Sequence, residues 1–333
     1  MCSRLLGGGS CLTTADRDAI IGADWAELRH VVEPLAGGQL KFLGTGSGDN
    51  DTESRMALRC LVRHAVSRVA PNAHGPVFGV VPVPARASDL NRKTILNAVS
   101  GILDACLLVP SPVATAYGLG QLTRTLVVDV GAGTVDMAVF DEEGKLPHYT
   151  DQITLPTGLA RTDRAFADAV LKQVGIGLSL DQAREMRERH GSAKGHVAGA
   201  VSRRNGEEPV CVSACLKQAC RSLVTSITTA LQELAQGGSR KPETVILTGG
   251  GSLLTGIDAV ARDILDRPVS LGRPIGLAGL KKDMSGPDFT TLAGTIAFAE
   301  RRLEARHAVD VPATLPGRVG RIVRLGRWLR ENF

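Results

Sequence analysis

The sequence predicts an α/β fold with two lobes, in which mixed sheets flanked by helices surround a cleft. Apolar runs of strand length alternate with segments of helical periodicity along most of the 333 residues. The chain also exceeds the length at which a single hydrophobic core usually continues to grow. Two of the expected strands end in glycine-rich turns, and ligands of α/β proteins bind at the carboxyl ends of strands.

The first half of the chain alternates strands with helices after a poorly patterned start over 1–17. The expected elements are a helix over 54–69, a buried strand over 77–83, a helix over 90–104, a strand over 105–109, a short helix from Val113 and a strand that leads into Asp129. This order favours a mixed or mostly parallel sheet that is covered by helices on both faces.

The second half begins with antiparallel strands and continues with helices. The expected elements are strands over 135–140 and 145–154, helices over 161–173, 180–190 and 213–236, short strands near Val197 and Val210, a strand over 244–248, and helices over 257–265 and 285–306. Pro312 and Pro316 then mark a linker before a last helix over 317–333.

Composition excludes several classes of protein. Hydrophobic residues make up 43% of the chain and aromatic residues only 3%, as in a globular α/β protein rather than a disordered chain. No uncharged apolar run reaches the roughly 20 residues that a bilayer requires. The start lacks the apolar core of a secretion signal, so we expect a cytoplasmic protein.

The cysteines and the charges exclude further kinds of site. The seven cysteines include no C-x-x-C pair, which argues against a disulfide framework and against a zinc site. The formal net charge is +5, but residues 317–333 alone carry five arginines and one glutamate. We therefore expect no nucleic-acid partner, because nucleic-acid binders carry basic patches on the folded body.

The stretch from Val127 to Asp136 has the pattern of a phosphate and metal cradle. An apolar strand meets a glycine turn with a carboxylate at each end, Asp129 and Asp136. Glycines allow backbone N–H groups to approach phosphate oxygens, and carboxylates suit a hydrated Mg²⁺. A nucleotide is the first ligand to consider, although the same turn also fits a tight β-hairpin.

Three segments in a fixed order, residues 81–119, 129–134 and 247–252, resemble the actin-like ATPase superfamily. This superfamily includes actin, the bacterial filament proteins MreB, MamK and FtsA, and the heat-shock chaperone ATPases. Residues 84–88, residues 116–119 and Ala132 are most similar to MamK, whereas the later part and the ending are similar to FtsA and MreB. The resemblance covers about residues 18–300 and implies a nucleotide cleft between the lobes.

The resemblance also implies binding residues. The second phosphate loop is expected at Asp129, Gly131, Ala132, Gly133, Thr134 and Asp136, and the adenosine loop at Gly249, Gly250, Gly251 and Ser252. The implied cofactors are ATP or ADP with Mg²⁺, which Asp129 faces through water. Arg184 and Arg187 lie on a helix whose equivalent contacts the base and ribose, although a solvated helix face also explains both arginines.

Two departures from the superfamily pattern concern the residues that bind the nucleotide's phosphates and hydrolyse them. The first phosphate loop, an Asp-x-Gly-Thr hairpin, has no counterpart before Asp51, and residues 7–10 lack the acid that a substitute needs. Ser111 stands where the superfamily has the glutamate that orients the attacking water. Loss of such a group costs on the order of 10²–10⁴ in rate, so slow or absent ATP hydrolysis is expected.

The last segment has the pattern of an amphipathic helix that lies on a membrane surface. Its apolar residues fall on one face and its arginines across from it. The expected membrane-binding residues are Arg318, Val319, Arg321, Ile322, Val323, Arg324, Arg327, Trp328, Leu329, Arg330 and Phe333. Each arginine near an anionic surface contributes roughly 1 kcal/mol. The alternatives are a helix docked on the protein's own core or in a partner's groove.

These observations predict a shortened first lobe over 18–140, a second lobe over 141–306, a linker over 307–316 and the terminal helix over 317–333. The resemblance implies a bacterial actin-like protein that binds adenine nucleotide and forms filaments, alone or with another cytoskeletal protein. It would position a membrane structure at the inner membrane. The alternatives are a degenerate actin-like scaffold without ATPase activity and a heat-shock-type ATPase, for whose substrate domain about 27 residues remain after residue 306. A sugar kinase lacks a matching signature.

Overall fold

The computed structural model describes residues 3–5, 19–21, 48–69, 75–120, 122–145, 147–193, 200–201 and 210–307. The predicted membrane-binding helix, the linker after His307 and residues 7–10 therefore lie outside the described residues. Two short strands near the N-terminus, β1 (Ser3–Leu5) and β2 (Ala19–Ile21), pair antiparallel with each other.

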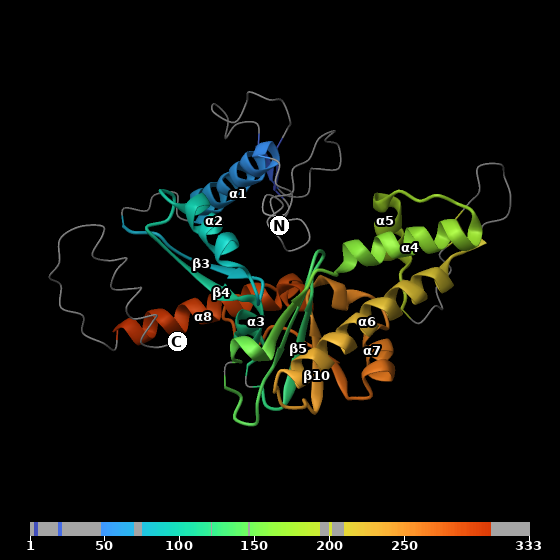
Figure 1. The fold of residues 1–333 in the computed structure, drawn as a ribbon. Helices are drawn as coiled ribbons and strands as arrows, with labels where there is room; N and C mark the ends of the chain where they lie inside the picture. Colours follow the sequence, from blue (N-terminus) through green and yellow to red (C-terminus); the bar gives the residue numbers. More distant parts are fainter. Residues whose placement is uncertain are drawn as a thin grey trace.

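The larger lobe is built on a mixed sheet with the strand order β11-β10-β5-β6-β7 (Figure 1). Its strands are β5 (Thr125–Val130), β6 (Val135–Val139), β7 (Gln152–Leu155), β10 (Thr244–Thr248) and β11 (Val269–Leu271). β5 runs parallel to β10 and antiparallel to β6. The alternation along β5 sends Val128 and Val130 into one hydrophobic core and Val127 into another, because successive side chains of a strand point to opposite faces.

The helices of the larger lobe lie on one side of this sheet, some against its strands and others packed on a neighbouring helix. They are α4 (Leu159–Val174), α5 (Leu180–His190), α6 (Ser213–Gln236) and α7 (Ile257–Leu265), with the short pair β8 (Ala200–Val201) and β9 (Val210–Cys211) before α6. α6 buries one stripe of its surface, which includes Leu223, Ile227 and Leu234, against the sheet and α4. α4 and α5 extend away from the sheet in Figure 1.

The smaller lobe contains the parallel strands β3 (Phe78–Val83) and β4 (Ala105–Pro110) and the helices α1 (Gly48–Val69) and α2 (Asp89–Val99). Leu58, Val83, Ile95 and Ala98 form its small core. The side chain of Ser88 caps α2 by accepting a hydrogen bond from the Asn91 N–H, which fixes the start of this helix.

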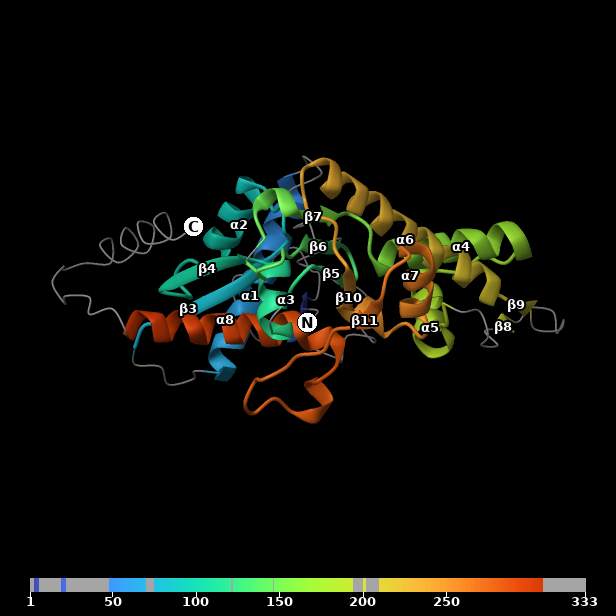
Figure 2. The ribbon, with the colours of Figure 1, turned by 90° about the horizontal axis from the view of Figure 1, so that it is seen from below.

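Two crossing helices join the lobes. α3 (Ser111–Leu119) connects β4 to β5, and α8 (Thr290–His307) packs against α3 and β3 (Figure 2). The helices approach so closely that a Cβ on Gly294 would lie 1.8 Å from the Ala114 carbonyl oxygen, and one on Gly118 would lie 2.3 Å from that of Thr290. The crossing is therefore possible only with glycine at these positions.

Most helices and strands lie close to the ranges that the sequence predicted, and a few differ in their bounds or were not predicted. The observed bounds of α5, α6, α7 and β10 agree with the predicted ranges, but β11 was not predicted. α2 ends at Val99 rather than 104, since Gly101 has a φ of 76° and Asp104 accepts a hydrogen bond from the Val77 N–H. Strand pairing also places β5 and β6 in the larger lobe's sheet, whereas the predicted division ended the first lobe at residue 140.

None of the helices in the described ranges combines the length and the apolar character that crossing a membrane requires. The described residues also contain no group of three or more His, Cys, Asp or Glu side chains placed to hold a metal ion.

Candidate functional site

The predicted phosphate turn is a tight hairpin at the end of β5. The Gly131 N–H donates to the Thr134 carbonyl at 2.9 Å, and β6 begins at the next residue. In the strand register Asp129 pairs with Asp136. The tight β-hairpin, one of the two interpretations of the sequence, is therefore present in the structure, and phosphate binding by the same turn stays a prediction.

The start of α4 braces this turn from behind. The N–H groups of Leu159 and Ala160 donate to the carbonyls of Gly131 and Ala132 at 3.1 and 2.8 Å. The first N–H groups of a helix have no partner within the helix, so the turn carbonyls satisfy them. The turn is consequently held in one conformation, with Ala132 at its exposed tip.

The second glycine turn lies directly against the first. β10 pairs with β5 in parallel, with Thr248 opposite Asp129, so both strands deliver their carboxyl ends to the same edge. Gly249 has a φ of 79°, and a Cβ there would lie 2.2 Å from Asp129 Oδ1. Gly250 is exposed and begins a short 3₁₀ helix (Gly250–Leu253), in which the Ser252 hydroxyl donates to the Gly249 carbonyl at 2.7 Å.

Asp129 lies at the junction of the two turns. Its Oδ2 accepts a hydrogen bond from the Thr291 hydroxyl of α8 at 2.6 Å and a longer one from the Thr115 hydroxyl of α3 at 3.5 Å. Burial raises the pKa of Asp129 above its ordinary value, and the two threonine hydrogen bonds oppose that rise. The carboxylate is thus costly to ionise unless a positive group lies beside it.

Asp136 joins the two lobes. Its Oδ1 accepts hydrogen bonds from the Ala85 N–H at 2.9 Å and from the Thr154 hydroxyl at 2.6 Å, and Thr134 donates to Oδ2 at 3.4 Å. Burial raises the pKa of Asp136 to about 6, an effect that these hydrogen bonds oppose and the nearby charge of Asp129 increases. The side chain is only 6% exposed, so its structural role is to bind the smaller lobe.

Comparisons with known proteins decide the family. The family model described as "Cell division protein FtsA" matches residues 126–294, just over half of the chain. The chain belongs to the FtsA family. The match includes both glycine turns and the start of α8, whereas α3, whose Thr115 also reaches Asp129, lies before it.

This FtsA-family chain is also similar to other bacterial actin-like proteins. The "Actin-like protein MamK" of Magnetospirillum gryphiswaldense is 28% identical over 298 residues, which cover 85% of this chain and 78% of that protein. The solved structure "MamK double helical filament" has a TM-score of 0.71 at 24% identity and covers 90% of both chains. "MreB5 of Spiroplasma citri bound to ADP" has a TM-score of 0.60 at 16% identity, covering 89% of this chain and 83% of that one.

These likenesses confirm the predicted actin-like fold and membership of the bacterial actin-like superfamily. The mixed sheet of the larger lobe, the smaller α/β lobe and the two helices that cross between them together form this fold in the FtsA-family chain.

Three predicted residues lie apart from the two turns or are engaged elsewhere. Arg187 forms a buried bidentate pair with Asp163 of α4, at 2.5 and 3.2 Å, which accounts for its position without a nucleotide. Arg184 is half-exposed and pairs with Glu188 one turn later at 2.9 Å. The Ser111 hydroxyl donates to the Val83 carbonyl at 2.9 Å.

The sequence reasoning missed the threonines around Asp129. Thr115 and Thr291 lie 176 residues apart in the chain. Thr115 falls within the segment 81–119 but was assigned no role, and Thr291 lies outside the three segments that carry the resemblance. The missed partners of Asp136, Ala85 and Thr154, likewise come from different lobes. Only a three-dimensional arrangement shows that these residues meet.

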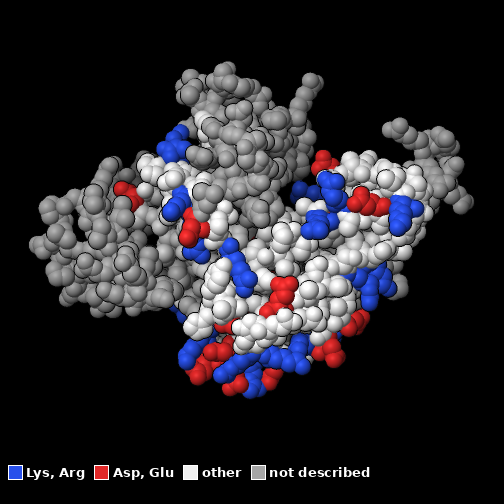
Figure 3. All heavy atoms as spheres, in the orientation of Figure 1, with Lys and Arg blue, Asp and Glu red and all other residues white. Residues whose placement is uncertain are grey.

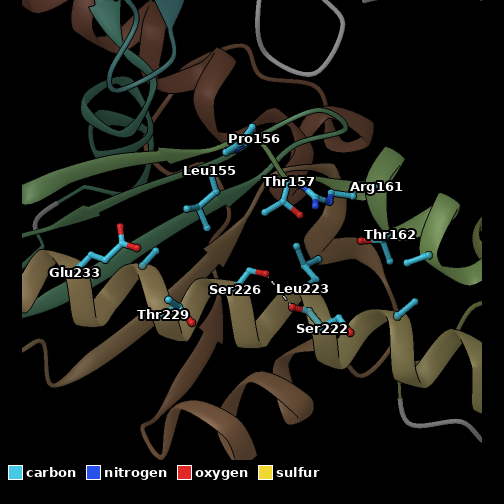
Figure 4. Close-up of a pocket in the computed structure, with 13 residues that line it drawn as sticks. Leu155, Pro156, Thr157, Arg161, Thr162, Ser222, Leu223, Ser226, Thr229 and Glu233 are labelled. Atoms are coloured by element: carbon cyan, nitrogen blue, oxygen red, sulfur yellow. Dashed lines mark hydrogen bonds between the residues drawn. The ribbon is translucent and has the colours of Figure 1, made fainter.

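Two cavities in the described part of the chain are lined by residues outside the glycine turns. One of about 440 Å³ lies between the end of β7, the start of α4 and α6, with Thr157 and Arg161 opposite Ser222 and Ser226 (Figure 4). The two serine hydroxyls donate to carbonyls of their own helix, so they are already satisfied. The other, of about 510 Å³, is lined by the ends of α3 and β6 and by α8, with Tyr117 and Arg301 in its wall.

Charged side chains of both signs are interspersed on the lower face in Figure 3. Among the ion pairs, Arg124 pairs with Glu142 and Glu243, and Arg240 lies 3.5 Å from Glu142. A mixed surface of this kind differs from the continuous basic face of a nucleic-acid-binding protein.

Proposed function

We propose that this chain binds an adenine nucleotide with Mg²⁺ where its two glycine turns meet, and that it assembles into filaments. The observation that carries the proposal is the contact between the turns: Gly249 lies against Asp129 Oδ1 at the carboxyl ends of two parallel strands. Such an edge is where α/β proteins bind their ligands. The ADP-bound MreB5 structure, which shares the fold, supports a nucleotide as that ligand.

The residues at the junction fit a magnesium ion. Mg²⁺ prefers carboxylate oxygens and usually keeps several of its waters. Asp129 offers Oδ1, to which no described residue donates a hydrogen bond, while Oδ2 is held by threonines. A cation there would also offset the cost of ionising this buried carboxylate. When bound, the ion would neutralise charge on the phosphates.

The chain's own residues would position the nucleotide. The rigid turn 131–134 presents its tip toward the phosphates, and the exposed Gly250 leaves a surface without side chains for the purine and ribose. Asp136 contributes by holding residue 85 of the smaller lobe against the turn. Arg187 is left out of the proposed site because its guanidinium is bound to Asp163.

Hydrolysis of the nucleotide is proposed to be slow. The Ser111 hydroxyl already donates to a backbone carbonyl, and a serine is a poor general base near neutral pH. The same observation favours a second candidate function, an actin-like scaffold that has lost nucleotide binding. The two candidates differ in whether Mg-ATP binds.

Binding is tested with the full chain and a fluorescent ATP analogue in the presence of Mg²⁺. Gly249→Ala is expected to weaken binding at least tenfold, since its Cβ would clash with Asp129 Oδ1. Gly175→Ala is the matched control, because Gly175 has a similar φ of 75° but ends α4 with open space around it. Absence of submillimolar binding by the unaltered chain would establish the scaffold function instead.

Assembly at the inner membrane is a separate part of the proposal. It is supported by the likeness to the MamK filament and by the pattern of apolar residues and arginines over 317–333. Sedimentation and electron microscopy with anionic vesicles test it, using the full chain and a variant that ends at residue 316. The proposal would be contradicted if the full chain stays monomeric and does not bind the vesicles under any nucleotide condition.

A further inference from the structure

We propose that Thr291 and Thr115 are positioning residues that orient Asp129 toward the bound cation. The inference rests on the proposed function, because it assigns these hydroxyls a role in that same site. It concerns two residues that the sequence patterns did not nominate, one from each of the two helices that join the lobes.

The three side chains form a short chain of contacts. Thr115 Oγ1 lies 2.7 Å from Thr291 Oγ1, which lies 2.6 Å from Asp129 Oδ2. Thr115 Oγ1 is also 2.8 Å from the Ser111 carbonyl oxygen. Thr115 is fully buried and Thr291 half-buried, so water does not readily replace these contacts.

The number of protons limits how these contacts are made. Each hydroxyl has a single hydrogen to donate, and neither a carbonyl nor an ionised carboxylate has one. If Asp129 is ionised, Thr291 donates to Oδ2, and the single hydrogen of Thr115 is divided between the Ser111 carbonyl and the Thr291 hydroxyl. The contact that fixes Asp129 most directly is therefore the one from Thr291, and hydrogen bonds to a charged acceptor are stronger than neutral ones.

The helix crossing holds both hydroxyls in place. Thr115 lies in α3 between Ala114 and Gly118. The backbones of α3 and α8 are so close there that a Cβ on Gly118 or Gly294 would clash with the other helix. Thr291 is the second residue of α8, and the Thr295 hydroxyl, one turn later, donates to its carbonyl at 2.7 Å. Neither threonine can move without shifting a closely packed helix. Oδ2 of Asp129 is therefore held beside the two helices that join the lobes.

Fixing Oδ2 leaves Oδ1 directed toward the second glycine turn, beside Gly249. A carboxylate that is held by one oxygen presents the other to a cation in a defined direction. Partners of this kind typically change metal affinity by about 10- to 100-fold when they are removed. Thr115 and Thr291 would thus set the affinity for Mg²⁺ without touching it.

The test compares Thr291→Val, which removes the hydroxyl, with Thr291→Ser, which keeps it. Binding of a fluorescent ATP analogue to the full chain is measured with MgCl₂ and again with EDTA. Thr291→Val is expected to lower affinity about 10- to 100-fold in MgCl₂ and to leave it unchanged in EDTA. Thr291→Ser is expected to retain the affinity of the unaltered chain in both.

The control is Thr228→Val, which removes a half-buried hydroxyl from α6, where it donates to the Val224 carbonyl of its own helix. Its affinity should equal that of the unaltered chain. If Thr291→Val does not fold in a thermal unfolding experiment, Thr115→Val replaces it, with a loss expected in the same direction and again only in MgCl₂.

The inference is overturned if the valine variant binds as tightly as the unaltered chain, loses affinity equally in EDTA, or is matched by the serine variant. Failure of the proposed function gives a different result, because the unaltered chain itself then shows no binding that depends on Mg²⁺. The positioning role of the threonines would be refuted together with that function.

Discussion

Replacing Asp136 by asparagine is expected to change how the stability of the protein depends on pH. The carboxyl is buried between the lobes, and its pKa is raised from 3.8 to about 6. An asparagine can keep the important contacts, because both short hydrogen bonds, from the Ala85 N–H and the Thr154 hydroxyl, reach the same oxygen. The substitution therefore removes the ionisation and preserves the acceptor.

The sign of this pH dependence follows from how tightly the folded and unfolded states bind a proton at Asp136. The folded protein binds a proton at Asp136 more tightly than the unfolded chain does, so the carboxyl favours folding below the unfolded pKa of about 4. This contribution is lost as the pH rises through about 6. The full effect is about 3 kcal/mol in the free energy of unfolding, of which about 2 kcal/mol falls between pH 4.5 and pH 8.

The assay is urea unfolding of the unaltered chain and Asp136→Asn at steps between pH 4.5 and pH 8. The stability of the variant minus that of the unaltered chain should rise by about 2 kcal/mol toward pH 8. Asp141→Asn is the control: hydrogen bonds from the Lys145 and Glu143 N–H groups lower the pKa of that exposed carboxyl from 3.8, so its ionisation affects stability only below this pH range and its difference should stay flat. A difference for Asp136→Asn that is flat, or that grows toward acid, would refute the reasoning.

Further substitutions test the packing and the chemistry. Arg187→Ala should cost about 3–5 kcal/mol in urea unfolding because it leaves the Asp163 charge buried and unpaired, and a cost under about 1 kcal/mol would contradict a buried pair. Gly294→Ala should force α3 and α8 apart and lower the free energy of unfolding by about 1–3 kcal/mol. Thermal unfolding measures the loss, and an unchanged midpoint would show that the helices do not cross as described. Ser111→Glu should increase phosphate release from ATP, and equal release by both proteins would mean that this position does not limit turnover.

Local patterns were sufficient to predict most of the strands, the main helices and both glycine turns. The period of apolar residues defines an amphipathic helix such as α6, and the turn residues define where β5 and β10 end. These signals lie within about twenty consecutive residues. For that reason the sequence alone was enough to name the superfamily and to nominate Asp129 and Gly249.

The tertiary structure decided what these residues contact. Burial and hydrogen-bond partners depend on residues far apart in the chain, and no local pattern encodes them. Asp136, nominated beside Asp129 for the same site, proved to join the lobes through Ala85, and Arg187 proved to be paired with Asp163. Asp129 acquired its threonine partners because the crossing of α3 and α8, which requires Gly118 and Gly294, brings distant helices to one carboxylate.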